Sequence, residues 1–231
     1  MSFFGTLFES YVIETFQRIM HGTSRLHSKI IYGKPEKESP EVILDYSPDF
    51  IFVDAKTSRL NLETVTTGDL SLYNKDLLEK CFFPPLKQMS NRIDDFKNKE
   101  FQINGKHYKD GDEIWPVIVC LDDFPLDTYI WEYLNKKIVE FNVTKPKNLQ
   151  IIHIHDLEYI EAILANNSGL SFLDILKEKN KEPFKDYYMN NFLHKTFGRI
   201  FIRENLWIEQ YWKKTSENIK YILFRKNKQF N

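Results

Sequence analysis

The segment from Pro40 to Lys56 constrains the fold most strongly, because two short apolar stretches there flank a turn. The stretches, Val42–Leu44 and Phe50–Val53, are rich in Val, Ile and Phe, which favour strands. The residues between them, 45–49, read Asp-Tyr-Ser-Pro-Asp and are mostly turn formers. We therefore predict a β-hairpin.

The register of this hairpin decides which charged side chains meet. If a loop over 46–49 brings Asp45 opposite Phe50, then Glu41 lies opposite Asp54. Directly opposed residues have Cβ atoms about 5 Å apart, and carboxylates that close repel unless a cation lies between them. Lys56 shares the face of Asp54, because side chains alternate along a strand. The hairpin thus predicts a site for a hard divalent metal ion, a water molecule and a phosphate.

The bulk composition fits a packed domain without a disulfide framework. The chain has 231 residues, of which 42% are hydrophobic and 15% aromatic. Its net charge of −1 argues against a general nucleic-acid coat protein but allows a local basic groove. Cys81 and Cys120 show no zinc spacing, so we expect buried free thiols in a reducing cytoplasm. Because Glu9 and Glu14 interrupt the apolar N-terminus and no basic region precedes it, we expect no signal peptide, and no apolar run is long enough for a membrane span.

Hydrophobic periodicity predicts helices and strands in alternation over the first ~165 residues. The expected helices cover 5–20, 69–82, 86–96, 129–141 and 156–165, and the expected strands cover 30–32, 114–121 and 149–154. Pro84-Pro85 predicts a break in the chain, and Asn104-Gly105 predicts a tight turn. We predict an α/β core over residues 1–165, with a helical C-terminal extension over 166–231 packed on it, including helices at 172–179 and 184–195.

Several features have both a structural and a functional interpretation. Glu9 lies at the rim of the apolar face of the first helix, where it is either a surface charge or an acid that faces the hairpin. His153 and His155 share a strand face, but without a third ligand nearby a structural role is favoured. The aromatic, basic segment after residue 206 is either core or interface. A run of basic residues is either a solvated surface or a phosphate-contacting edge; its members are Arg18, His21, Arg25, His27, Lys29, Lys34 and Lys37.

Taken together, Glu9, Pro40-Glu41 and Asp54-Ala55-Lys56 resemble the motif of the PD-(D/E)xK nuclease superfamily, which includes many restriction endonucleases. Flanking segments resemble a group of uncharacterised bacterial nuclease-like proteins, so the likeness extends over most of the chain. These segments are 52–60, 66–70, 86–88, 115–119 and 121–125. The resemblance implies a restriction-endonuclease-like core in which helices flank a mixed central sheet.

The resemblance also implies roles for individual residues. Metal binding falls to Glu41, Asp54, Glu9 and the carbonyl of Ala55, with Mg²⁺ or Mn²⁺ as the cofactor. Lys56 would orient the attacking water or stabilise the charge that develops on the phosphate. Gln88 resembles a glutamine that some members place near the site.

One departure from the family pattern leaves an alternative for the first acid. Glu41 stands where the family usually has aspartate, whereas Pro48-Asp49 matches the motif by letter. Asp49 and Asp54 are five residues apart, so on one strand they would face opposite sides about 16 Å apart. We therefore favour Glu41. Asp45 shares its face but lies nearer the turn, where a structural role is expected.

The leading functional hypothesis is a cytoplasmic, metal-dependent nuclease that hydrolyses phosphodiester bonds, with DNA as substrate, in restriction or phage defence. A homodimer or a partner protein of a defence system is the expected assembly, and no membrane is involved. The alternative is a catalytically inactive nuclease-like module that binds nucleic acid or a protein partner. A third reading is an interaction protein in which the acids are surface charges.

Overall fold

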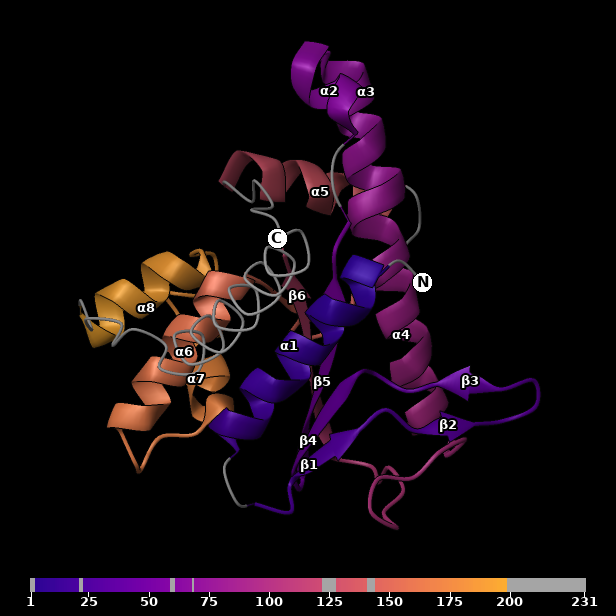
Figure 1. Ribbon diagram of the computed structural model, residues 1–231, viewed down its shortest axis with the longest axis vertical. Coiled ribbons are helices and arrows are strands. Elements are labelled where there is room, and N and C mark those ends of the chain that lie inside the picture. The colour runs from indigo at the N-terminus through magenta and orange to yellow at the C-terminus, as the bar shows by residue number, and fades with distance from the viewer. Residues whose placement is uncertain are drawn as a thin grey trace, which may run out of the picture.

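A mixed sheet lies at the centre of the molecule (Figure 1). The computed structural model describes residues 3–20, 23–58, 61–67, 69–121, 128–140 and 144–198. Within these residues the sheet has five strands, which follow in spatial order as β1 (Leu26–Ser28), β4 (Val42–Tyr46), β5 (Asp49–Lys56), β6 (Glu113–Cys120) and β7 (Gln150–His153). β1, β4 and β5 are antiparallel neighbours, whereas β6 and β7 run parallel to β5.

Helices cover both faces of this sheet, which confirms the predicted α/β class with a mixed, helix-flanked sheet. On one face Ile51 and Val53 belong to a buried cluster with residues of α1 (Phe3–Ile19), α6 (Ile154–Asn166), α7 (Phe172–Lys179) and α8 (Met189–Phe197). On the other face Phe50 and Phe52 pack with residues of α4 (Phe83–Lys97) and α5 (Thr128–Glu140). Because side chains alternate along β5, Asp54 lies on the α4 face.

The predicted break at Pro84-Pro85 is wrong. α2 (Leu62–Thr67) and α3 (Leu70–Asp76) lead into a π-helix, η1 (Leu77–Phe82), and η1 continues directly into α4. The two prolines occupy the first turn of α4, where backbone N–H groups have no helical partner to lose. The N–H of Phe83 donates to the carbonyl of Leu78, so the wider π turn joins the two segments.

Other expectations are confirmed or adjusted. Ile31–Tyr32 forms β2, which pairs with β3 (Lys37–Glu38) in a separate two-stranded sheet and not in the central one. Asn104-Gly105 turns the chain between Ile103 and Lys106, with positive φ at both turn residues. The helix expected at 184–195 begins only at Met189, after a series of turns.

The C-terminal part of the described chain packs on the same core as the N-terminal helix. The rings of Phe16 and Phe172 lie 5.3 Å apart in an edge-on arrangement. The proposed boundary at residue 165 stays a prediction, and the aromatic, basic segment after residue 206 lies outside the described residues.

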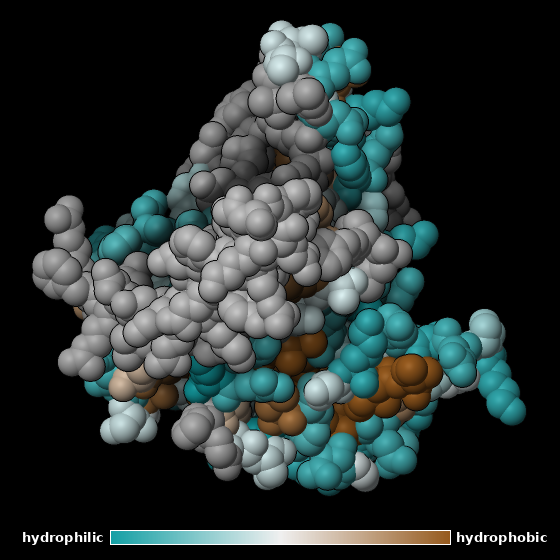
Figure 2. All heavy atoms as spheres, in the orientation of Figure 1, coloured by the Kyte–Doolittle hydropathy of each residue, from teal (hydrophilic) through white to brown (hydrophobic). Residues whose placement is uncertain are grey.

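Across the described chain, no helix combines the length and the apolar character that crossing a membrane requires. In the view of Figure 2, hydrophilic residues cover most of the described surface, with apolar residues showing mainly around β1 and β2.

Candidate active site

Glu41 and Asp54 lie opposite each other, as the predicted register requires. Val42 pairs with Val53 in the β4–β5 ladder, so the next opposed positions along the hairpin are those of Glu41 and Asp54. Lys56 follows on the face of Asp54, with its Nζ atom 3.5 Å from Asp54 Oδ2. The hairpin therefore gathers two acids and a lysine at its open end, on the face that α4 covers.

Both carboxylates are removed from water, Asp54 with 0% and Glu41 with 3% of its surface exposed. Glu41 Oε2 accepts a hydrogen bond of 3.2 Å from the backbone N–H of Ala55. Burial, followed by the negative charge of Asp54 and a hydrogen bond to it, raises the pKa of Glu41 to about 8, against the opposing charges of Lys56 and Arg92. At neutral pH the acid pair therefore holds a proton in this metal-free arrangement.

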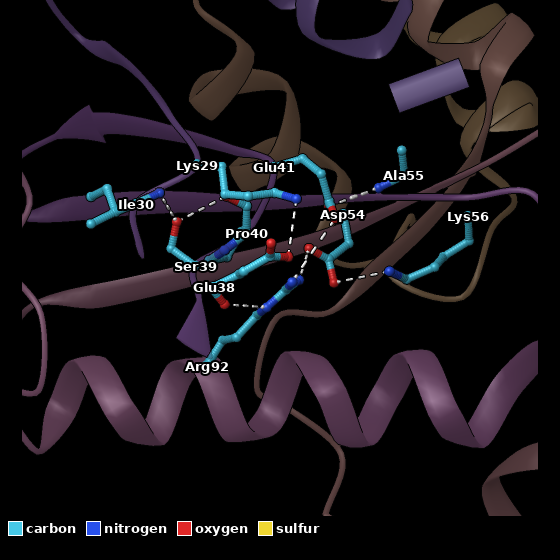
Figure 3. A network of polar contacts seen from close by, with 10 residues as sticks. All are labelled: Lys29, Ile30, Glu38, Ser39, Pro40, Glu41, Asp54, Ala55, Lys56 and Arg92. Atoms are coloured by element: carbon cyan, nitrogen blue, oxygen red, sulfur yellow. Dashed lines mark hydrogen bonds and ion pairs between the residues drawn. The ribbon is translucent and has the colours of Figure 1, made fainter. Parts of the chain in front are cut away.

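The cation that lies against both acids is Arg92 of α4, which was not predicted from the sequence as a site residue (Figure 3). One terminal nitrogen pairs with Asp54 Oδ1, and the other lies 3.9 Å from Glu41 Oε1. Its Nε atom donates to the carbonyl of Glu38 at 3.0 Å. Arg92 is only 5% exposed. The guanidinium thus neutralises the carboxylates that the hairpin brings together.

The position of Arg92 in the helical repeat is a sequence signal that this side chain is buried. It lies three residues after Met89 and four before Phe96, and both of these are fully buried on α4. A charged residue at that spacing falls inside the apolar stripe of the helix. Burial of an arginine requires an acidic partner, and the hairpin carries two.

Asp54 Oδ2 is the unsatisfied atom of the site. It is fully buried and accepts no hydrogen bond from the described residues, since Lys56 Nζ approaches only to ion-pair distance. Lys56 itself keeps 17% of its side chain exposed, so it lies at the rim of the buried pair. A buried carboxylate oxygen without a donor has one open coordination position, next to a lysine that reaches solvent.

The remaining predicted site residues are Gln88, Glu9 and Ala55. Gln88 is exposed on α4, one turn before Arg92, and lines a neighbouring hollow. Glu9 belongs to α1, whose apolar residues pack on the opposite face of the sheet. Ala55 is buried and donates its N–H to Glu41, and its carbonyl stays a predicted ligand. No group of three or more His, Cys, Asp or Glu side chains within the described ranges could hold a metal ion, so Glu9 does not join Glu41 and Asp54 in one cluster.

The two acids at the turn have other partners. Asp49 pairs with Tyr46 across a turn of only Ser47 and Pro48, tighter than the loop over 46–49 that we predicted. Its carboxylate accepts from Trp115 Nε1 at 3.0 Å and from Lys177 Nζ at 2.8 Å. Those contacts hold Asp49 at the far end of β5 from Asp54.

Asp45 has the structural environment expected for it. Its carboxylate accepts from the N–H of Ser47 at 3.0 Å and from Lys106 Nζ at 2.7 Å. The Lys106 ammonium and the Ser47 hydroxyl and N–H lower the pKa of Asp45, against the effect of its burial. Asp45 therefore stabilises the turn as a carboxylate.

The histidine pair also has structural contacts. His153 Nε2 lies 2.8 Å from the carbonyl of Leu121, and its Nδ1 accepts from the N–H of His155 at 3.2 Å. His153 is the N-cap of α6. Cys81 and Cys120 are buried and are not joined in a disulfide, as predicted.

Much of the basic run is neutralised by acids. Arg18 pairs with Glu161, Lys29 with Glu38, and Lys37 with both Asp95 and Glu100. His21 lies outside the described residues. The run is therefore no continuous array of uncompensated charge.

The donor set fits a hard divalent cation. Two carboxylates supply the oxygen ligands that Mg²⁺ and Mn²⁺ prefer, and Mg²⁺ commonly binds through one or two carboxylates, with the rest of its shell from water and phosphate. Asp54 Oδ2 has the free acceptor position that such an ion needs. Glu41 and Asp54 would hold the ion, with Lys56 beside it.

Comparison with known proteins finds a distant structural likeness. No family model matches the chain, and no curated protein matches it. Among solved structures, the small subunit (R.BspD6I2) of the heterodimeric restriction endonuclease R.BspD6I aligns with a TM-score of 0.45 and 10% sequence identity. The alignment covers 82% of this chain and 87% of that one.

Proposed function

We propose that this protein is a divalent-metal-dependent nuclease that hydrolyses phosphodiester bonds. The observation that carries the proposal is the arrangement at the open end of the hairpin: Glu41 opposite Asp54, Lys56 on the same face, and a buried Asp54 oxygen with no hydrogen-bond donor in the described chain. Acids and a lysine so arranged suit phosphoryl chemistry, because negative charge develops on the phosphate oxygens during hydrolysis.

Each residue has a distinct role in this proposal. Asp54 and Glu41 supply the ligands, and the bound ion would lower the pKa of a water molecule and neutralise charge on the phosphate. Lys56 lies at the solvent-exposed rim, where its ammonium can hydrogen-bond the attacking water or a phosphate oxygen. Gln88, exposed on α4, is a candidate contact for the substrate next to the site.

DNA is the substrate we propose, and it rests on the family resemblance of the sequence motif alone. A role in restriction or phage defence, and action as a homodimer or with a partner protein, rest on the same resemblance. The proposed location is the cytoplasm, where two reduced cysteines are stable.

The second candidate is an inactive nuclease-like module that binds nucleic acid or a protein partner. The contact of Arg92 with Asp54 favours it, because a guanidinium already neutralises the acid that would bind the metal. In that case Asp54 and Arg92 form a buried structural ion pair, and divalent cations have no effect on the protein.

Cleavage assays separate the two candidates. Purified protein is incubated with single-stranded and double-stranded DNA and with RNA, in Mg²⁺, in Mn²⁺ and in a chelator. We expect metal-dependent cleavage that Lys56→Met abolishes, while its circular dichroism spectrum and melting temperature stay close to wild type. Lys177→Met is the matched control, since Lys177 also pairs with a β5 aspartate but on the opposite face. Full cleavage by Lys56→Met would refute the proposed site, and no metal-dependent cleavage of any substrate would favour the inactive module.

A further inference from the structure

Arg92 pairs with the same Asp54 carboxylate that would bind a metal ion. Its guanidinium pairs with Asp54 Oδ1 and lies 3.9 Å from Glu41 Oε1. Both acids are buried, and the arginine is 5% exposed, so few water molecules screen these charges. The guanidinium is therefore a cation in direct contact with the carboxylate that a metal ion would bind.

An arginine and a dication in this position exclude each other. Arg92 and Lys56 carry one positive charge each, which matches the full negative charge that Glu41 and Asp54 can supply. An additional divalent ion would leave the buried site with excess positive charge. Like charges in contact repel strongly where water is excluded. Binding at Asp54 therefore requires the guanidinium to leave.

The structure provides a place for the displaced side chain. Arg92 also lines a hollow of about 480 Å³ between α4 and the β2–β3 pair, together with Tyr32, Lys37 and Asp95. The Asp95 carboxylate, three residues further along the same helix, accepts from Tyr32 Oη at 2.8 Å and from Lys37 Nζ at 3.1 Å. A rotation of the Arg92 side chain would exchange the buried Asp54 carboxylate for the Asp95 carboxylate, which solvent reaches.

We propose that Arg92 is an internal cation that competes with the divalent metal ion for Asp54 and withdraws into this hollow when the ion binds. The proposal rests on the metal-dependent function proposed above and adds its regulation. In the metal-free protein Arg92 offsets the negative charge of Asp54 and so disfavours the binding of a further cation there. The apparent metal affinity is then the intrinsic affinity reduced by the stability of the arginine contact.

Calorimetric titration with Mn²⁺ tests the competition without any substrate. Arg92→Gln removes the charge but keeps a polar side chain, and we expect it to bind Mn²⁺ about ten to a hundred times more tightly than wild type, the range for a hydrogen-bonded charged contact. Lys177→Gln is the control, because Lys177 pairs with Asp49 at 2.8 Å on the other face of the sheet. We expect this variant to bind Mn²⁺ with the same affinity as wild type. Equal or weaker binding by Arg92→Gln than by wild type overturns the competition and leaves the metal site intact.

The same titration separates this outcome from failure of the metal site itself. If neither wild type nor Arg92→Gln binds Mn²⁺, both proposals fall. If Arg92→Gln does not fold, Arg92→Lys replaces it. Lysine keeps the positive charge but lacks the planar guanidinium group whose nitrogens contact both acids. We expect Arg92→Lys to bind Mn²⁺ more tightly than wild type, and unchanged affinity in that variant overturns the competition.

Discussion

The ion pair between Asp54 and Arg92 should contribute strongly to the stability of the metal-free protein. Asp54→Ala leaves a guanidinium that is 5% exposed without its main partner. Removal of one member of a buried pair costs about 3–5 kcal/mol. Glu41, 3.9 Å from the other terminal nitrogen, can take part of that charge when it ionises. We therefore expect a loss near the lower limit, about 3 kcal/mol.

Asp49→Ala is the internal comparison, because Asp49 is also buried on β5 and pairs with a cation. Its partner Lys177 keeps 41% of its side chain exposed, so the ammonium is rehydrated when the acid is removed. The Trp115 Nε1 donor loses its acceptor, and the total cost should be about 1–2 kcal/mol.

Urea denaturation in a chelator measures both changes. With a slope of about 2 kcal/mol per molar urea, Asp54→Ala should lower the midpoint by roughly 1.5 M and Asp49→Ala by less than about 1 M. A loss below about 1 kcal/mol for Asp54→Ala, or equal losses for the two variants, would contradict the buried ion pair.

Three further outcomes follow from the structure. The pKa of Glu41 is raised to about 8 by burial and by Asp54, so the folded state binds more protons than the unfolded state between the usual pKa and pH 8. The metal-free protein should therefore lose stability as the pH rises from 5 to 8, in total by more than about 1 kcal/mol, and Glu41→Gln should flatten this slope in urea titrations. Burial lowers the pKa of Lys179 to about 8, and its Nζ atom donates to the carbonyl of Lys185 at 2.9 Å. Thermal melts at pH 7 should show Lys179→Met to be as stable as wild type or more so, and a large loss of stability would contradict the cost of burying this charge. Gly105 has a φ of +76°, so Gly105→Ala should cost about 1 kcal/mol in the same melts, and no change would indicate that the turn relaxes.

The β-hairpin could be predicted because its information is local. Period-two alternation and the turn formers fixed the face of every residue on β5, and the register followed from one pairing. The apolar run over 114–121 likewise indicated a strand, and as β6 it lies between β5 and β7. The position of Lys56 beside Asp54 follows from the same alternation.

The contribution of α4 could not be predicted with the same certainty, because it depends on tertiary packing. The contact between Arg92 and Asp54 joins residues 38 positions apart, and local spacing does not fix how a helix rotates over a sheet. The π turn of η1 had no recognisable local signal, so the prolines after it indicated a break where the helix continues. Glu9 could not be placed for the same reason: periodicity gives the apolar face of a helix but not the face of the sheet that the helix covers.

Diffraction with anomalous scattering from Mn²⁺ would show whether Glu41 and Asp54 form a metal site. Crystals grown in a chelator and then transferred to Mn²⁺ would locate the ion against the known positions of both acids. We predict a single strong anomalous peak in contact with Asp54 and Glu41, with the Arg92 guanidinium moved toward Asp95. A peak at Asp49 or another acid, or no peak while Arg92 stays on Asp54, would contradict the claim.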